Sequence, residues 1–76
     1  RNNSERALAE ICCEVLGLKK IGIDDNLFQM GADSLSVIQM QIKTYTFDWN
    51  LTMQDFYKYP TIRQLSGRIN SLAEAA

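Results

Sequence analysis

Apolar residues recur at helical spacing along three stretches of this sequence, and no stretch shows the alternation of apolar and polar residues that is typical of a strand. The chain has one proline and four glycines, so few positions would interrupt a helix. Its 76 residues are close to the lower limit for a chain that folds alone on one hydrophobic core. We therefore expect one all-α domain over residues 1–76, a small four-helix bundle with three main helices and one short helix.

The helices nearest the two ends of the chain have clear starts and one apolar face each. The first is expected over residues 4–16, between a capping Ser4 and Gly17, which would close the helix in the left-handed conformation. The last begins with the capping-box pattern Thr61-Ile62-Arg63-Gln64. Their inward-facing residues are expected to be Leu8, Ile11, Cys12, Val15, Leu16, Ile62, Leu65, Ile69 and Leu72.

Two segments without a sustained period connect the helices. Residues 17–33 form a long connection for so small a domain, which indicates that the segment is pinned down or has a function. Within it, Asp24-Asp25-Asn26 is expected to start a single helical turn. Residues 46–51 form a loop, after which Thr52-Met53-Gln54-Asp55 resembles a capping box and opens a short helix that carries Phe56 and ends before Pro60. The side chains expected to anchor the two loops are Leu18, Ile21, Ile23, Leu27, Phe28, Met30, Phe47 and Trp49.

The second main helix, expected over residues 34–45, has apolar residues on two sides. One stripe follows the spacing i, i+3, i+7, i+10. Val37 and Met40 lie on a different side of the helix. Such a helix is either buried nearly all round or keeps one face for a partner. The residues of the stripe are Leu35, Ile38, Ile42 and Tyr45, and we expect the first three to form a partner surface.

Several classes of function are disfavoured by the composition. Histidine is absent, so a Ser-His-Asp or Cys-His site cannot form, and the common zinc sites lose their usual ligand. Cys12 and Cys13 are neighbours rather than a C-x-x-C pair, so at least one is expected to be a small core residue in a reducing, cytoplasmic setting. We expect no catalytic residue, no metal site and no enzymatic activity of the domain alone.

The charge and hydropathy patterns also limit the partners. The net charge of −1 provides no basic face for nucleic acid. No apolar run is long enough to span a bilayer, and the chain does not open with a signal segment. We expect no nucleic acid and no membrane partner, and a monomer when the domain is isolated. The first residue is Arg1 rather than methionine, which suggests a domain excised from a longer protein.

Ser34 stands where the long connection becomes the second helix, behind Gly31 and behind Asp33, which is expected to cap the helix. A serine placed there is exposed and close to the positive end of the helix dipole. Those conditions suit a serine that carries a covalently attached phosphate, although they also describe an ordinary serine in a first helical turn.

These residues resemble a known family. The run Gly31-Ala32-Asp33-Ser34-Leu35, preceded by Asp25-Asn26-Leu27-Phe28, is similar to the attachment motif of carrier protein domains. The block Leu51-Thr52-Met53-Gln54-Asp55-Phe56, with Tyr59-Pro60-Thr61-Ile62-Arg63-Gln64-Leu65, is similar to the closing segment of peptidyl carrier (thiolation) domains of nonribosomal peptide synthetases. The resemblance extends from about Ala7 to Leu72.

The resemblance implies an acyl carrier protein-like four-helix fold and a 4′-phosphopantetheine group on Ser34. A separate phosphopantetheinyl transferase would attach this group from coenzyme A. The thiol of the arm would hold aminoacyl or peptidyl groups as thioesters and present them to adenylation, condensation and thioesterase or other terminal domains. Asp33 is expected to act mainly as the N-cap, with a direct role in metal or transferase binding as an alternative.

The sequence departs from the family's usual motif at Met30 and Ala32, where many members have leucine and glycine. Residues 34–45 contain no acidic residue and one base, Lys43, which favours a peptidyl carrier over the strongly acidic carriers of fatty acid synthesis. Two alternatives stay open. One is an acyl carrier of a polyketide or other pathway, and the other is a helical interaction module that is never modified.

Overall fold

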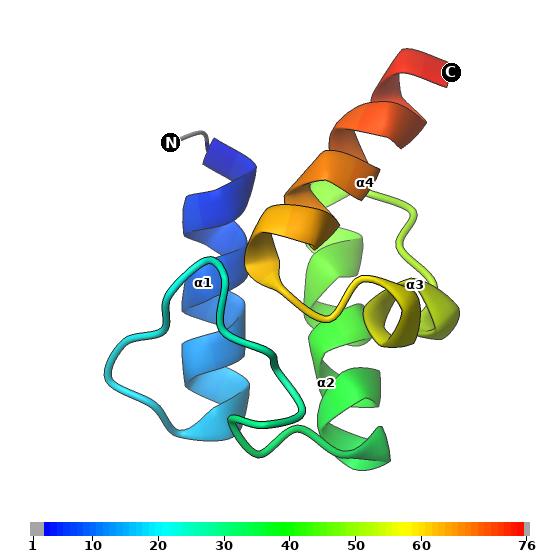
Figure 1. Cartoon of the computed structure of the whole chain (residues 1–76). Coiled ribbons are helices and arrows are strands. Elements are labelled where there is room, and N and C mark those ends of the chain that lie inside the picture. Colours follow the sequence, from blue (N-terminus) through cyan, green and yellow to red (C-terminus); the bar gives the residue numbers. More distant parts are fainter. Residues whose placement is uncertain (1–2, 76) are drawn as a thin grey trace.

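The computed structural model describes residues 3–75. These residues form an all-α bundle without strands in that range, as the sequence predicts. Helix α1 packs beside α2 and α4, and the short α3 lies against α2 and α4 (Figure 1). The start of α1 and the end of α4 lie at one end of the bundle, opposite the start of α2 (Figure 1). The elements are α1 (Asn3–Leu16), α2 (Ser34–Thr44), the 3-10 turn η1 (Tyr45–Phe47), α3 (Met53–Lys58) and α4 (Ile62–Ala75).

One hydrophobic core joins all four helices. Every inward-facing residue predicted for α1 and α4 is either buried or packed against this core, with Val15, Leu16 and Leu72 only partly buried. Burial of apolar side chains is the main source of stability for a domain of this size. The buried apolar residues are Leu8, Ile11, Cys12, Leu27, Val37, Met40, Leu51, Phe56, Ile62, Leu65 and Ile69.

Helix α1 ends as predicted but starts differently. Gly17 has φ +69°, and the N–H of Leu18 donates to the carbonyl of Cys13 at 2.9 Å, which closes the helix. The prediction that Ser4 caps the helix was wrong, because α1 already includes Asn3 and the Ser4 hydroxyl lies 2.5 Å from the hydroxyl of Ser66 in α4. Ser4 therefore links two helices instead of closing one.

The cysteines are unpaired, and Cys12 is fully buried, as expected of a small core residue. Burial, with a smaller contribution from the neighbouring Cys13, raises the pKa of the Cys12 thiol to about 12. Cys12 is therefore an unreactive thiol at neutral pH, since the thiolate is the nucleophilic form.

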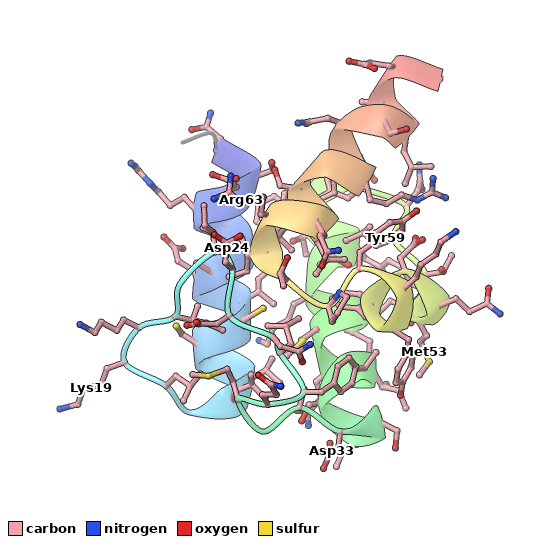
Figure 2. The ribbon with its side chains drawn as sticks, viewed as in Figure 1. Lys19, Asp24, Asp33, Met53, Tyr59 and Arg63 are labelled. Carbon is pink, nitrogen blue, oxygen red and sulfur yellow. The ribbon has the colours of Figure 1, made fainter. Side chains whose placement is uncertain are left out.

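Residues 17–33 cross the bundle and are fastened to the start of α4. The N–H of Leu27 donates to the Pro60 carbonyl at 2.8 Å, and the N–H of Arg63 donates to the Ile23 carbonyl at 2.9 Å. The Arg63 guanidinium also donates two hydrogen bonds to the Asp24 carboxylate, at 2.7 and 2.9 Å. Figure 2 shows these two side chains meeting between the loop and α4. The long connection is thus an ordered part of the fold.

Most of the side chains predicted to anchor residues 17–33 are confirmed as anchors. Leu27 is buried, and Ile21, Ile23 and Phe28 pack against the core. Leu18 and Met30 are only half-buried and lie outside the core cluster.

The connection between α2 and α3 differs from the prediction. Residues 45–47 form the turn η1, so α2 ends at Thr44. Trp49 packs against the core as expected, but Phe47 is 46% exposed and stacks on Trp49 with 4.5 Å between ring centroids. The anchor role predicted for Phe47 was therefore wrong, because its ring contacts the anchor instead of the core.

The two predicted capping boxes have different outcomes. In the first, the Thr52 hydroxyl accepts from the Asp55 N–H at 3.2 Å, and the Asp55 carboxylate accepts from the Thr52 N–H at 2.9 Å. In the second, the Thr61 hydroxyl accepts from the Gln64 N–H at 3.2 Å but itself donates to the Gln64 side chain. The box at α3 is complete, whereas only half of the box at α4 forms.

The core and the exposed side of α2 should respond very differently to a new charge. Leu65→Asp should largely unfold the domain, because Leu65 is fully buried and the carboxylate would have no partner. The matched change Ile38→Asp should alter the free energy of unfolding by less than about 1 kcal/mol, because Ile38 is 40% exposed. Thermal and urea unfolding of the two variants measures this difference. Similar unfolding of both variants would contradict the assignment of Ile38 to the surface.

Candidate functional site

The start of α2 is built by a tight series of turns before it. The Asn26 side chain accepts hydrogen bonds from the N–H groups of Phe28 and Gln29, at 2.9 and 3.2 Å. The N–H of Ala32 then donates to the Leu27 carbonyl at 3.0 Å. Gly31 has φ +113°, a conformation that side-chain-bearing residues rarely adopt. The predicted turn after Asn26 is therefore present as a series of turns rather than a helix, and it delivers the chain to Asp33 in a fixed orientation.

Asp33 is the N-cap of α2, as predicted. Its backbone is extended, and one carboxylate oxygen, Oδ1, accepts from both the N–H and the hydroxyl of Ser36, each at 2.9 Å. The Asp33 carbonyl accepts from the N–H of Val37 at 2.9 Å, the first hydrogen bond of the helix. Figure 2 shows Asp33 at the end of the bundle where α2 begins.

Hydrogen bonds from Ser36 lower the pKa of the Asp33 carboxyl below its usual value. The carboxylate consequently stabilises the folded state fully above the ordinary carboxyl pKa, and this contribution is lost as the pH falls through the lowered pKa. At neutral pH the cap is ionised next to the positive end of the helix dipole.

The two serines of the first turn are not equivalent. Ser36 is half-buried, and its hydroxyl donates to Asp33. Ser34 is exposed, and its hydroxyl has no hydrogen-bond partner among residues 3–75. The sequence analysis did not predict that Ser36 would bond to the Asp33 carboxylate. A hydroxyl three residues after a capping aspartate is a signal for such a hydrogen bond. Of the two hydroxyls, only that of Ser34 is both exposed and without a hydrogen-bond partner among the described residues.

The surroundings of Ser34 fit a phosphate ester. The dipole of α2 favours a negative group at that position, where the Asp33 carboxylate already accepts from the Ser36 N–H. Among the described residues there is no cluster of three or more metal-binding side chains. The site therefore offers an exposed hydroxyl and an anion-favouring helix start.

The two apolar sides of α2 have different surroundings. Val37, Met40 and Thr44 are buried, whereas the predicted stripe lies on the exposed side that also carries Ser34. The helix is therefore not buried all round. The exposed fractions are 62% for Leu35, 40% for Ile38, 58% for Ile42 and 60% for Tyr45.

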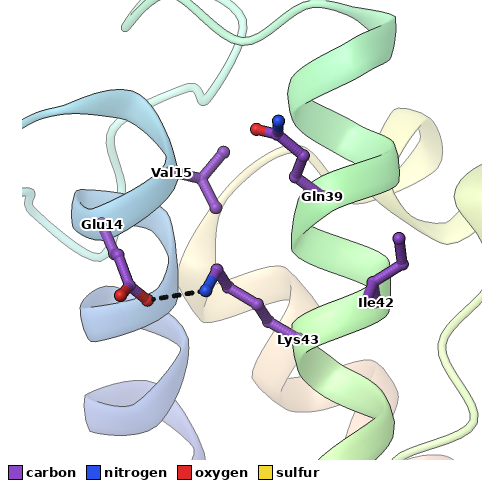
Figure 3. A pocket seen from close by; sticks show the side chains of 5 residues that line it. All are labelled: Glu14, Val15, Gln39, Ile42 and Lys43. Atoms are coloured by element: carbon purple, nitrogen blue, oxygen red, sulfur yellow. Dashed lines mark ion pairs between the residues drawn. The ribbon is translucent and has the colours of Figure 1, made fainter.

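Helix α2 contributes no acidic side chain to this surface. Its single basic residue, Lys43, pairs with Glu14 of α1 at 3.0 Å (Figure 3). The face beside Ser34 is thus largely apolar and uncharged.

Within residues 3–75, no helix is both long and apolar enough to pass through a membrane.

The sequence matches the family described as "Phosphopantetheine attachment site" over residues 6–69. It is 43% identical over 65 residues to gramicidin S synthase 1 of Brevibacillus brevis, a match that covers 86% of this chain and 6% of that protein. It is 39% identical over 75 residues to bacitracin synthase 2 of Bacillus licheniformis, covering 99% of this chain and 3% of that protein. The chain therefore corresponds to a small part of these relatives.

Solved structures agree with this match. A structure described as "Non Ribosomal PCP domain" superposes with a TM-score of 0.82 at 27% identity, covering 88% of this chain and 87% of that one. A chain from the complex of the phosphopantetheine transferase Sfp with coenzyme A and a peptidyl carrier protein superposes with a TM-score of 0.87 at 32% identity. That match covers 93% of this chain and 94% of the other. The chain belongs to the phosphopantetheine attachment site family, and it is a peptidyl carrier domain with an acyl carrier protein-like fold.

Proposed function

We propose that this domain carries aminoacyl and peptidyl groups, as thioesters on 4′-phosphopantetheine, between the catalytic domains of a nonribosomal peptide synthetase. The family match and the likeness to parts of peptide synthetases support this function. In this proposal the domain supplies no catalytic group, and the reactions belong to its partners. We propose that the domain functions in the cytoplasm, where coenzyme A is present and where free thiols such as Cys12 and Cys13 stay reduced.

The attachment residue in this proposal is Ser34. The observation that carries it is the exposed hydroxyl at the first residue of α2, next to a neighbouring serine whose hydroxyl is already engaged by Asp33. Asp33 holds the turn in place and keeps the helix start fixed, so the Ser34 hydroxyl is presented to a transferase at low cost in entropy. Once attached, the group supplies the thiol on which acyl groups are held.

The attachment step balances with coenzyme A as the donor. The Ser34 oxygen forms a bond to the phosphorus nearest the pantetheine, and the bond between the two phosphates of coenzyme A breaks, which releases adenosine 3′,5′-bisphosphate. In this proposal a base on the transferase takes the Ser34 proton, because the neighbouring Asp33 carboxylate has a lowered pKa and is a weak base. Negative charge on the new phosphodiester is favoured by the helix start.

We propose that Leu35, Ile38 and Ile42 are the contact surface for partner domains. They are exposed, they lie beside Ser34 on one side of α2, and the polar residues between them are uncharged. Proposed partners are a phosphopantetheinyl transferase and adenylation, condensation and thioesterase domains. Two solved relatives support the first two, a peptidyl carrier protein in complex with a transferase and an A-PCP structure with phenylalanyl-adenylate.

The attachment residue is tested by mass. Ser34→Ala should fold normally and gain no phosphopantetheine mass after incubation with coenzyme A and a broad-specificity phosphopantetheinyl transferase. The matched control Ser36→Ala loses a hydroxyl in the same turn but should still be modified, because Ser34 remains. Intact-mass spectrometry reads both results. Modification that persists in Ser34→Ala would assign the group to another residue.

The nature of the cargo is tested by offering the modified domain two loading systems. One is a panel of adenylation domains with amino acid and ATP, and the other is a malonyl transferase with malonyl-CoA. We expect aminoacyl loading at a rate that changes little between low and moderate salt, because α2 presents an apolar surface without acidic residues. Efficient malonyl loading without aminoacyl loading would show an acyl carrier instead, and would leave the attachment at Ser34 intact.

A further inference from the structure

A shallow groove runs along the seam between α1 and α2, outside the hydrophobic core. It is lined by Glu14 and Val15 of α1 and by Gln39, Ile42 and Lys43 of α2. Figure 3 shows Gln39 and Lys43 extending from α2 toward α1, with Lys43 meeting Glu14. We call this hollow the α1–α2 groove. The proposed partner surface includes only one of its five residues, Ile42.

The α1–α2 groove lies within reach of a group attached to Ser34. Ser34, Ile38 and Ile42 follow one another at four-residue steps, so they lie along one exposed side of α2. The rise from Ser34 to Ile42 is about 12 Å at about 1.5 Å per residue. An extended phosphopantetheine chain is longer than this rise. Cargo on the arm can therefore fold back along α2 into the groove.

The lining of the groove matches the chemistry of an aminoacyl group. Val15 is partly buried and Ile42 is 58% exposed, so their methyl groups can contact an apolar side chain. The Gln39 amide has both donors and an acceptor for the amides of the arm. Glu14 is the one carboxylate in the lining.

Glu14 has the capacity for a second cation. Its Oε1 pairs with the Lys43 ammonium at 3.0 Å, and its Oε2 has no partner among residues 3–75. A carboxylate accepts several hydrogen bonds through its two oxygens. The α-ammonium of an aminoacyl thioester carries the complementary charge, whereas malonyl and acetyl groups do not.

We propose that the α1–α2 groove seats the carried aminoacyl group, with Val15 and Ile42 contacting its side chain and Oε2 of Glu14 accepting its α-ammonium. This inference rests on the proposed function, since it needs an arm on Ser34. Seating is weak and reversible, because Glu14 and Lys43 have side chains that are 67% and 41% exposed and the groove stays open to water. The groove thus holds the loaded state near the domain between transfers.

The test uses three forms of the isotope-labelled domain, each made with a coenzyme A analogue and a broad-specificity transferase. One carries the bare arm, one carries leucine through a stable amide with its ammonium free, and one carries N-acetyl-leucine through the same amide. NMR follows the methyl groups of Val15 and Ile42 and the side-chain amide of Gln39. The leucyl form should shift these signals relative to the bare arm, and the N-acetyl form should lose most of the shift.

Three variants sharpen the test. Glu14→Gln should abolish the leucyl-dependent shifts, whereas Glu10→Gln, one turn earlier on α1 and outside the groove, should leave them unchanged. Lys43→Gln should enlarge them, because it removes the competing cation from Glu14. Intact mass first shows that the arm is attached, so failure of attachment counts against the proposed function alone. Equal shifts with leucine and N-acetyl-leucine, or leucyl-dependent shifts confined to other parts of the domain, would overturn the groove assignment.

Discussion

The cap that Asp33 places on α2 is the interaction on which the candidate site depends. By accepting two hydrogen bonds from Ser36, the carboxylate fixes the residue at which the helix begins. Helical side chains follow a fixed angular order, so the burial of Val37 and Met40 in the core leaves Leu35 and Ile38 outside. Successive side chains are about 100° apart around the helix, so Ser34 lies on the same exposed side as Ile38. The exposure of the apolar stripe thus follows from core packing, and the place of Ser34 at the first residue of the helix follows from the cap.

The connection before Asp33, residues 17–33, is attached to the start of α4 and supports this cap. Leu27 is held to Pro60 by a backbone hydrogen bond, and Ile23 and Asp24 are both held by Arg63. The loop is therefore joined to the start of α4 by hydrogen bonds, and α4 in turn contributes Leu65 and Ile69 to the core. The proposed attachment site at Ser34 thus rests on a packed scaffold, which agrees with the proposed role of presenting one residue to several partners in turn.

Local patterns in the sequence predicted much of this structure. The features that were predicted correctly depend on neighbours within a few residues. They are the apolar period of α1 and α4, the left-handed Gly17, the capping box at Thr52 and the cap at Asp33. The errors came from contacts between side chains that no helical period encodes. Ser4 contacts Ser66 across the bundle, and Phe47 stacks on Trp49 while Trp49 reaches the core. The Asp24–Arg63 pair spans 39 residues, so no local pattern indicates it.

The central claim is that Ser34, and not the serine two residues later, receives the phosphopantetheine group. Both serines lie in a single tryptic peptide between Lys20 and Lys43, so fragmentation of that peptide from the modified domain separates them. We predict fragment ions that place the added mass on Ser34 and leave Ser36 unmodified. Fragment ions that place it on Ser36, whose hydroxyl is engaged by Asp33 in this structure, would contradict the claim.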